Sequence, residues 1–329
     1  MAGQFINNAT LLSGLVAYRD ELTAKEILTQ PIFEARTAAI ISVATGVKGT
    51  QTINVLTPSL VLTAAACGLQ AGTGSVTLAQ QNITVNDVMV TEDICYLGSG
   101  TLAKYYTGVT MKKGVKVEDL TPPIFAAAYI ADKQKQIQNL VEKAIWQSNN
   151  SGSGTFSTDA NMVYTNGLLY QLQFGQGTAS VISGNGTYSN AALVPLTAVD
   201  ILKGMVAVIP QDIADKDLVA FMSVNNYNTL KNAIIDKNNF FFTAVGEDSY
   251  KFKWPYAGEI TIMATSGLVG RNDIVLTEPS NLWYGCDLES DFDTFDIWDS
   301  KDLNAIRFRS LFRLGTAIAF PQYVVYYKG

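Results

Sequence analysis

The chain of 329 residues is 48% hydrophobic and 16% charged, which is enough to bury a substantial core as one large domain or as two or three smaller ones. It contains no histidine, so catalysis by a Ser-His-Asp or Cys-His arrangement is excluded. A net charge of −6 argues against sequence-specific binding of nucleic acid through a basic patch, but it leaves loose contact on one face open.

Residues 1–36 are predicted to form an N-terminal arm. Within them, residues 17–28 have a helical pattern in which Leu22, Ile27 and Leu28 share one side, and Pro31 follows where the helix has to end. Loops are expected on both sides of this short helix. We therefore interpret the segment as an arm.

Residues 37–107 are predicted to form a long hairpin of low charge. Lys48 and Lys104 are its only lysines, while Val, Ile, Thr and Gly dominate, a composition that favours extended strands and turns. Glycines give a flexible turn between the two halves, and the candidate tip residues are Gly68, Gly72 and Gly74. An apolar hairpin of this length is expected to need a surface to lie on.

A long helix is predicted from about residue 121 to 147, within segment 108–154. Thr121 can cap free backbone N–H groups, and two prolines follow where a missing N–H costs nothing. At 1.5 Å per residue the helix would be about 40 Å long, and residues 149–154 form a flexible connection after it. Its apolar positions fall on one stripe: Ile130, Ile137, Leu140, Val141, Ala144 and Ile145.

Residues 155–248 mix glycine-rich loops with two shorter helices, predicted at 197–208 and 225–235. Between the helices, residues 218–222 are predicted to form a short buried strand. Pro210 and an acidic loop separate this strand from the first helix. The order of helix, loop, strand and helix is typical of an α+β layer.

The last segment, 249–329, is predicted to contain consecutive short strands. Within residues 306–313, positions 306, 308 and 312 are apolar and positions 307, 309 and 313 are arginines, which is the period of two that marks a half-buried strand. Upstream, four carboxylates follow the same spacing and would lie on one strand face. The candidate register or assembly contacts are Asp287, Glu289, Asp291, Asp293, Arg307, Arg309 and Arg313.

Two interpretations of the arginine face stay open. It is either a solvated strand face or a charged seam, and such a seam could lie within the sheet or between subunits. Opposed charges across paired strands contribute only about 0.2 to 1 kcal/mol each, so a seam would set register and partner choice more than stability. A Ca²⁺ site at the acidic series is disfavoured, because the glycine and distal glutamate of the helix-loop-helix site are missing.

No other motif argues for a ligand or for catalysis. Cys67, Cys95 and Cys286 are too few and too scattered for a disulfide framework or a zinc site, and Gly175-Gln176-Gly177 lacks the rest of a phosphate-binding loop. No apolar run approaches the roughly 18 residues that span a bilayer, and the N-terminus lacks a signal-peptide pattern. We therefore expect no catalytic residue, no cofactor, no metal and no membrane partner.

The order of these elements resembles the major capsid proteins of tailed bacteriophages, which have the Hong Kong 97-type fold. In that family an arm, an E-loop hairpin and a spine helix precede a central A-domain and the return strands of a peripheral P-domain. The resemblance covers nearly the whole chain, and the order carries it because each motif is degenerate alone. Particular stretches are also similar: 208–210, 221–223, 226–230, 258–262, 281–287, and 307–327 with Gly315 and Phe320-Pro321.

The resemblance implies an α+β fold of the Hong Kong 97 type and a mechanical function. The chain would be a major capsid protein that assembles as hexamers and pentamers into an icosahedral shell around double-stranded DNA. It implies this division of the chain: N-terminal arm 1–36, E-loop hairpin 37–107, P-domain part with the spine helix 108–154, A-domain 155–248, and P-domain return strands and C-terminus 249–329.

Expectations about partners follow from the same resemblance. The shell would form in the bacterial host cytoplasm and become part of the virion, with portal, decoration or head-closure proteins as further partners and with non-specific DNA contact. Because the chain opens directly into the arm, a separate scaffold protein or none is implied. Lysine–asparagine cross-linking is not expected, because Lys48 and Lys104 lie away from the hairpin tip. The alternatives are an encapsulin-like compartment shell and a strand-rich tail-tube or surface-lattice protein.

Overall fold

The computed structural model describes residues 35–59, 75–95, 122–152, 156–175, 181–182, 193–238, 250–256, 260–287, 294–300, 302 and 305–329. The predicted arm, except for residues 35 and 36, lies outside these ranges, as does the predicted helix at 17–28. The candidate hairpin tip, at Gly68, Gly72 and Gly74, lies outside them as well.

A five-stranded sheet forms one half of the fold, and its long central strand is β12. On one side β12 pairs antiparallel with β10 and β11, and on the other side it pairs antiparallel with β4, while β1 runs parallel to β10. The strands are β1 (Ser42–Thr45), β4 (Asn86–Cys95), β10 (Leu282–Cys286), β11 (Thr294–Ser300) and β12 (Ala305–Ile318).

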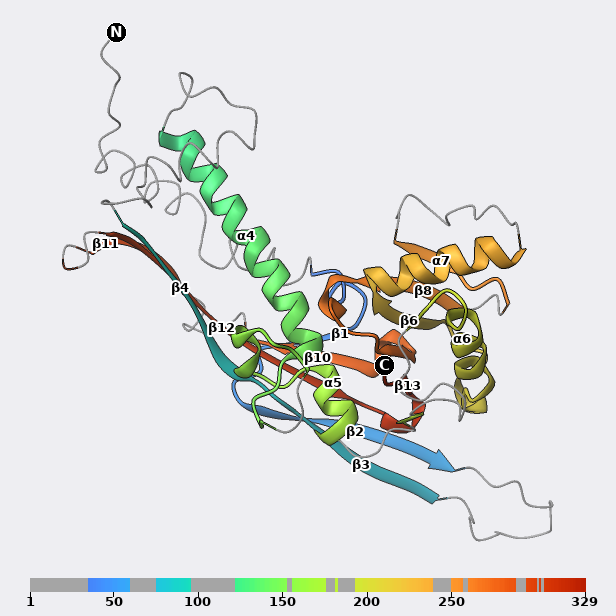
Figure 1. Cartoon of the computed structure of the whole chain (residues 1–329). Helices are drawn as coiled ribbons and strands as arrows, with labels where there is room; N and C mark the ends of the chain where they lie inside the picture. Colours follow the sequence, from blue (N-terminus) through green and yellow to red (C-terminus); the bar gives the residue numbers. More distant parts are fainter. Residues whose placement is uncertain are drawn as a thin grey trace, which may run out of the picture.

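The long helix α4 (Pro122–Gln147) packs on one face of this sheet (Figure 1). Its apolar stripe, which includes Val141 and Ile145, is buried in one core with Phe308 and Phe312 of β12. The arginines that alternate with these phenylalanines are only partly buried, as the period of two requires. The helix ends near the predicted position, where a polar run follows Gln147.

A second sheet has six strands in the order β5-β13-β9-β6-β8-β7. One of its faces carries α6 (Ala198–Ala207) and α7 (Val224–Asn238), and the other meets the C-terminal end of α4 around Trp146. The strand faces alternate strictly, because Phe221 of β6 contacts the α4 side while its neighbours Ala220 and Met222 contact the α6 side. The strands are β5 (Val181–Ile182), β6 (Leu218–Ser223), β7 (Lys251–Lys253), β8 (Ile260–Thr265), β9 (Ile274–Thr277) and β13 (Val325–Tyr327).

The second sheet contains strands from both sides of residue 248, the boundary expected between the A-domain and the P-domain return strands. Strand β6 lies before that position, but its neighbours β8 and β9 lie after it, and β13 lies at the C-terminus. The segment 249–329 therefore supplies strands to both sheets. The reason is that β8 pairs in parallel with β6 and buries Ile260, Ile262 and Ala264 beneath α6 and α7.

The segment expected to form one hairpin divides into three parts. Strands β2 (Thr50–Ser59) and β3 (Ser75–Thr84) pair antiparallel as a two-stranded hairpin that extends away from the two sheets (Figure 1). Strand β1 before it and strand β4 after it both join the first sheet.

Short helical segments complete the fold. Gly175, which began the glycine pair considered above, ends one of them; Gln176 and Gly177 lie outside the described ranges. The segments are η2 (Ala160–Val163), α5 (Leu168–Tyr170), the π-helical η3 (Gln171–Gly175), η4 (Gln211–Ile213), η5 (Ser266–Leu268), η6 (Pro279–Asn281) and η7 (Pro321–Tyr323).

Candidate functional site

The arginine face of β12 is paired with carboxylates on neighbouring strands of the same chain. Arg307 lies opposite Asp93 of β4 in the strand register and binds it through two bonds, Nε to Oδ1 at 2.6 Å and Nη2 to Oδ2 at 2.9 Å. Arg313 bridges Asp87 of β4 at 2.6 Å and Asp287, just after β10, at 2.8 Å. These two arginines therefore tie β12 to the strands beside it.

Arg309 is held more loosely than the other two arginines. It donates one hydrogen bond, from Nη2 to Asp296 of β11 at 2.8 Å, and its guanidinium lies 5.4 Å from the ring centroid of Trp298. Its side chain is 41% exposed, compared with 35% for Arg307 and 14% for Arg313. Arg309 is the arginine of this face that has most room for a contact with another molecule.

The predicted acidic series supplies only one of the observed partners. Asp287 contacts Arg313, while Glu289, Asp291 and Asp293 lie outside the described residues. The other carboxylates, Asp87, Asp93 and Asp296, were missed because the sequence does not say which strands pair. A signal was present in β4, where residues 87 and 93 occupy the same strand face at the period of two.

The Asp93–Arg307 pair is expected to respond to acid. Hydrogen bonds from Arg307 hold the pKa of Asp93 below its ordinary value of 3.8. The pair therefore contributes stability above that ordinary value, and this contribution is lost as the pH falls through the lower pKa of the folded state. In Arg307→Gln the pKa of Asp93 should return toward its ordinary value, as measured by NMR titration of the carboxyl carbons.

Asp159 provides the internal control for that titration. Its pKa is also lowered, by a hydrogen bond from Lys143 and by one from the backbone of Asn161, neither of which involves Arg307. It should titrate at the same pH in both proteins. A pKa of Asp93 that stays low in the variant would contradict the assignment of the shift to Arg307.

The base of the hairpin crosses the first sheet at two glycines. Gly285 of β10 and Gly315 of β12 are opposite each other in the register. A Cβ atom at position 315 would lie 2.1 Å from the carbonyl oxygen of Thr84, and one at position 285 would lie 2.7 Å from Cδ1 of Ile83. Side chains at these positions are incompatible with the close approach of β3, so the two glycines fix where the hairpin leaves the body.

The described part of the hairpin exposes an uncharged polar ladder. Cross-strand hydrogen bonds join Thr50 to Thr84 at 3.1 Å, Thr52 to Asn82 at 3.2 Å and Asn54 to Gln80 at 3.2 Å. The hairpin was expected to be apolar, but this face consists of hydroxyl and amide groups. Residues 49–86 contain no Asp, Glu, Lys or Arg, so the low charge remains its main feature.

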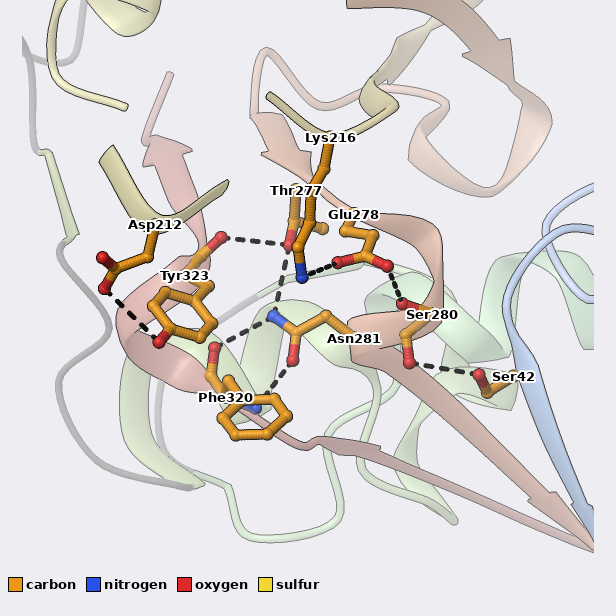
Figure 2. A network of polar contacts seen from close by, with 9 residues as sticks. All are labelled: Ser42, Asp212, Lys216, Thr277, Glu278, Ser280, Asn281, Phe320 and Tyr323. Carbon is orange, nitrogen blue, oxygen red and sulfur yellow. Dashed lines mark hydrogen bonds and ion pairs between the residues drawn. The ribbon is translucent and has the colours of Figure 1, made fainter. Parts of the chain in front are cut away.

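The chain passes from the second sheet to the first between β9 and β10, and back to the second sheet between β12 and β13. A polar network joins these two crossings. Figure 2 shows Asn281 between them. Its amide donates to the carbonyl of Phe320 at 2.9 Å and accepts from the N–H of Phe320 at 2.6 Å, as a neighbouring β-strand would. Thr277 donates to the carbonyl of Tyr323 at 3.1 Å. Asn281 is 5% exposed, so it fixes the two crossings together inside the protein.

The same network reaches the surface at Glu278. Both of its carboxylate oxygens are used, since Ser280 donates to one at 2.6 Å and Lys216 to the other at 3.0 Å. These two bonds lower the pKa of Glu278, the bond from Ser280 being the larger cause. Ser42 of β1 then donates to the backbone carbonyl of Ser280 at 3.1 Å. The chain of bonds connects the loop before β6 to the first sheet (Figure 2).

A buried carboxylate fixes α4 to the second sheet. Glu142 accepts hydrogen bonds from the backbone N–H of Thr37 at 2.9 Å, from the hydroxyl of Thr37 at 2.5 Å and from the hydroxyl of Thr265 in β8. Trp146 donates to the hydroxyl of Thr37 at 2.8 Å. No pattern in the sequence predicts this cluster, because its members are far apart along the chain.

Among the described residues, no group of three or more His, Cys, Asp or Glu side chains is arranged to hold a metal ion. Within the same ranges, no helix has the length and hydrophobicity that crossing a bilayer requires. Cys286 is buried as a free thiol. The notable contacts of the described residues are therefore structural. The arginine–carboxylate pairs set strand register, the two glycines fix the hairpin base, and the Asn281 and Glu142 networks join parts of the fold.

No protein-family model matches the sequence, and no curated protein matches it. Solved structures of phage particles do match. A chain of the satellite phage P4 procapsid, in a structure that includes the size determination (Sid) protein, has a TM-score of 0.62 at 10% identity over 98% of each chain. A chain of the cyanophage A-1(L) capsid has a TM-score of 0.52 at 14% identity over 92% of each chain. A chain from the capsid of the native GTA particle has a TM-score of 0.50 at 12% identity over 89% of each chain.

Such low identities show the fold alone. The coverage is nevertheless almost complete for both partners in each comparison, so the likeness concerns the whole architecture and not one sheet or helix. The prediction of fold class is confirmed: the chain has the α+β fold found in phage capsids.

Proposed function

We propose that this chain is the major capsid protein of a tailed double-stranded DNA bacteriophage. It would assemble with itself as hexamers and pentamers into an icosahedral shell that encloses the genome. The observation that carries the proposal is the match over 98% of both chains to the satellite phage P4 procapsid structure. Its role would be structural and non-enzymatic.

The hairpin supplies a physical reason for self-assembly. A two-stranded hairpin is at best marginally stable alone in water, and in the described part of the chain β2 and β3 pair only with each other and extend from the body beyond their base. A neighbouring copy that covers the hairpin would bury surface worth about 25 cal/mol per Å² of apolar area. Repeated over many subunits, this contribution would exceed that of any one surface ion pair.

The arginine face has a divided role in this proposal. Arg307 and Arg313 set strand register within the chain, because their guanidinium groups are used by Asp93, Asp87 and Asp287. Arg309 is the candidate contact between subunits, because it is somewhat more exposed than Arg307, at 41% against 35%, and donates one hydrogen bond to its carboxylate partner where Arg307 donates two.

Arg309→Glu is expected to reduce assembly more than folding. The new carboxylate would face Asp296, but exposed pairs of this kind contribute only about 0 to 1 kcal/mol to stability. Thermal unfolding followed by circular dichroism should therefore change little, while sedimentation velocity should show fewer large assemblies. Arg309→Gln is the control that removes the charge without reversing it. A normal yield of shells from Arg309→Glu would show that Arg309 makes no important contact between subunits.

The proposal places the protein in the virion, after assembly in the cytoplasm of a bacterial host. Packaged DNA would be contacted non-specifically, which suits a net charge of −6, since an acidic wall does not adhere tightly to phosphates. Portal, separate scaffold, decoration and head-closure proteins are the partners that such a shell would have.

Sedimentation velocity of the purified protein over a range of concentrations and salt tests the proposal. A capsid subunit should convert from a slow species to one large species of uniform size above a threshold concentration. An encapsulin-like shell would co-purify with a cargo enzyme from its own host, and a tube-forming protein would give a continuous range of sizes. Either of those results would replace the capsid proposal.

A further inference from the structure

The outer edge of β4 lies beside an apolar groove. Strand β4 pairs with β12 along one edge, and no described strand pairs with its other edge. The groove between β4, α4 and η2 has a volume of about 270 Å³, and no charged side chain lines it. We call it the edge groove and define it by residues 88–91 of β4, by Leu140, Val141 and Ala144 of α4, and by Met162 and Tyr164.

The main chain of β4 forms part of the wall of the edge groove. Successive side chains of a strand point to opposite faces, yet the consecutive residues 88–91 all border the groove. Val88 and Val90 pack against the core that α4 covers, whereas Met89 is 58% exposed. A free strand edge presents unpaired N–H and C=O groups to which another strand can bind. The groove therefore fits an extended segment that continues the sheet and inserts apolar side chains toward α4.

The occupant of the edge groove should be uncharged and should carry apolar side chains. A charged side chain would lose hydration there without gaining an opposite charge. Residues 1–18 meet this requirement, since they contain no Asp, Glu, Lys or Arg and include the apolar pairs Phe5-Ile6 and Leu11-Leu12. In an extended segment the two members of such a pair point to opposite faces, so either register places an apolar side chain in the groove.

The same segment is attached to the body of the protein close to the groove. Thr37, near the start of the described chain, donates to Glu142 of α4. At 3.6 residues per turn, Glu142 lies on the side of the helix opposite Leu140 and Ala144. The attachment is therefore about one helix diameter, roughly 10–12 Å, from the groove. Residues 19–34 could span that distance even as a helix, at about 1.5 Å per residue.

We propose that residues 2–16 pair with the free edge of β4 in their own chain and place apolar side chains in the edge groove. The short tether gives the segment an effective concentration in the millimolar range at its own groove, far above that of a second copy in dilute solution. The contact covers an edge that otherwise invites uncontrolled pairing between copies. It goes beyond the proposed shell function, because it forms within a single subunit before assembly.

Photo-cross-linking of dilute, unassembled subunits tests the proposal. A benzophenone amino acid replaces Tyr164, which is 56% exposed at the groove. Unlabelled and ¹⁵N-labelled subunits are mixed, so that mass spectrometry separates links within one copy from links between copies. The expected result is a link from position 164 to residues 2–16 of the same copy, with a yield that does not change on dilution. The same amino acid at the exposed Tyr256, just after β7, should give no link to residues 2–16.

A proline variant and a valine variant separate strand pairing from other contacts. Proline lacks the N–H that a strand ladder needs, whereas valine favours strands. The proline variant combines Phe5→Pro, Ile6→Pro, Leu11→Pro and Leu12→Pro, and the other variant has valine at the same positions. The link yield should fall at least about tenfold with proline and stay near that of the unmodified sequence with valine. Amide hydrogen exchange of residues 86–95 should be faster in the proline variant than in the valine variant.

Three results would overturn the proposal. They are the absence of a link between position 164 and residues 2–16, links to residues 2–16 of a second copy alone, and equal yields and exchange rates in the two variants. All of these measurements are made on unassembled subunits, so they do not depend on whether the protein forms shells. A failure of this contact and a failure of the capsid proposal can therefore be told apart.

Discussion

Replacing Gly315 with alanine is expected to destabilise the protein by about 1 to 3 kcal/mol, the usual cost of overpacking a close contact. The added methyl group would lie 2.1 Å from the carbonyl oxygen of Thr84 and 2.9 Å from Cα of Val85. Both are backbone atoms, so the clash can be relieved only if β3 moves away from the sheet. Denaturant unfolding gives the loss in free energy, and proteolysis of the native protein shows whether the hairpin base has loosened.

Gly49→Ala is the matched control at the same hairpin base. A Cβ atom there meets nothing within 4 Å, and Gly49 has no positive φ that would strain an alanine. Its free energy of unfolding should stay within about 0.5 kcal/mol of the unmodified protein, as for most surface changes. Equal stabilities of the two variants would show that Gly315 does not serve as the crossing point for β3.

Glu142→Ala is expected to cost roughly 3 kcal/mol or more, because leaving even one buried donor unpaired costs about 1 to 3 kcal/mol and a cavity is added. The variant removes the acceptor for the N–H and hydroxyl of Thr37 and for the hydroxyl of Thr265. Thr37, whose hydroxyl accepts a hydrogen bond from Trp146, would then no longer be held in place by Glu142. The loss is measured by chemical unfolding of the purified subunit under conditions that prevent assembly.

Two variants of α4 make this result specific. Glu142→Gln keeps the volume and one carbonyl oxygen, so its loss should be smaller than that of alanine. Lys135→Ala changes an exposed position on the same helix and should be close to neutral. If Glu142→Ala and Lys135→Ala had the same stability, the cluster would not be the anchor of α4 on the second sheet.

The sequence predicted those elements whose own residues carry the pattern. The alternation of arginine and phenylalanine in β12 identified a half-buried strand, and the apolar stripe of α4, with prolines at its start, identified the long helix. The strand predicted at 218–222 is β6 (Leu218–Ser223), and the helices beside it were also predicted from their local sequence. In each case a local period and a local start or stop signal were enough.

Pairing between distant segments could not be predicted from these patterns. Asp93 pairs with Arg307 across 214 positions, and Thr37 contacts Thr265 across 228. A strand pattern shows which residues share a face, but it does not show which strand lies beside it. The same limit explains the division expected at 248, because nothing local in β6 indicates that β8 and β9 become its neighbours.

The low charge of the hairpin is the feature that the sequence and the structure share there. The absence of charge between residues 49 and 86 was visible in the sequence, and it led to the expectation that this segment needs another surface. The structure adds that the exposed side chains of the hairpin base are amides and hydroxyls. The contact with a neighbour would therefore depend on hydrogen bonds as well as on apolar burial.

Electron microscopy of the purified, concentrated protein tests the central claim most directly. If the chain is a capsid subunit, negatively stained samples should contain closed isometric shells of uniform diameter, with hexamers and pentamers visible after averaging. Monomers alone over a wide range of salt and protein concentration would contradict the claim, as would open tubes or flat lattices.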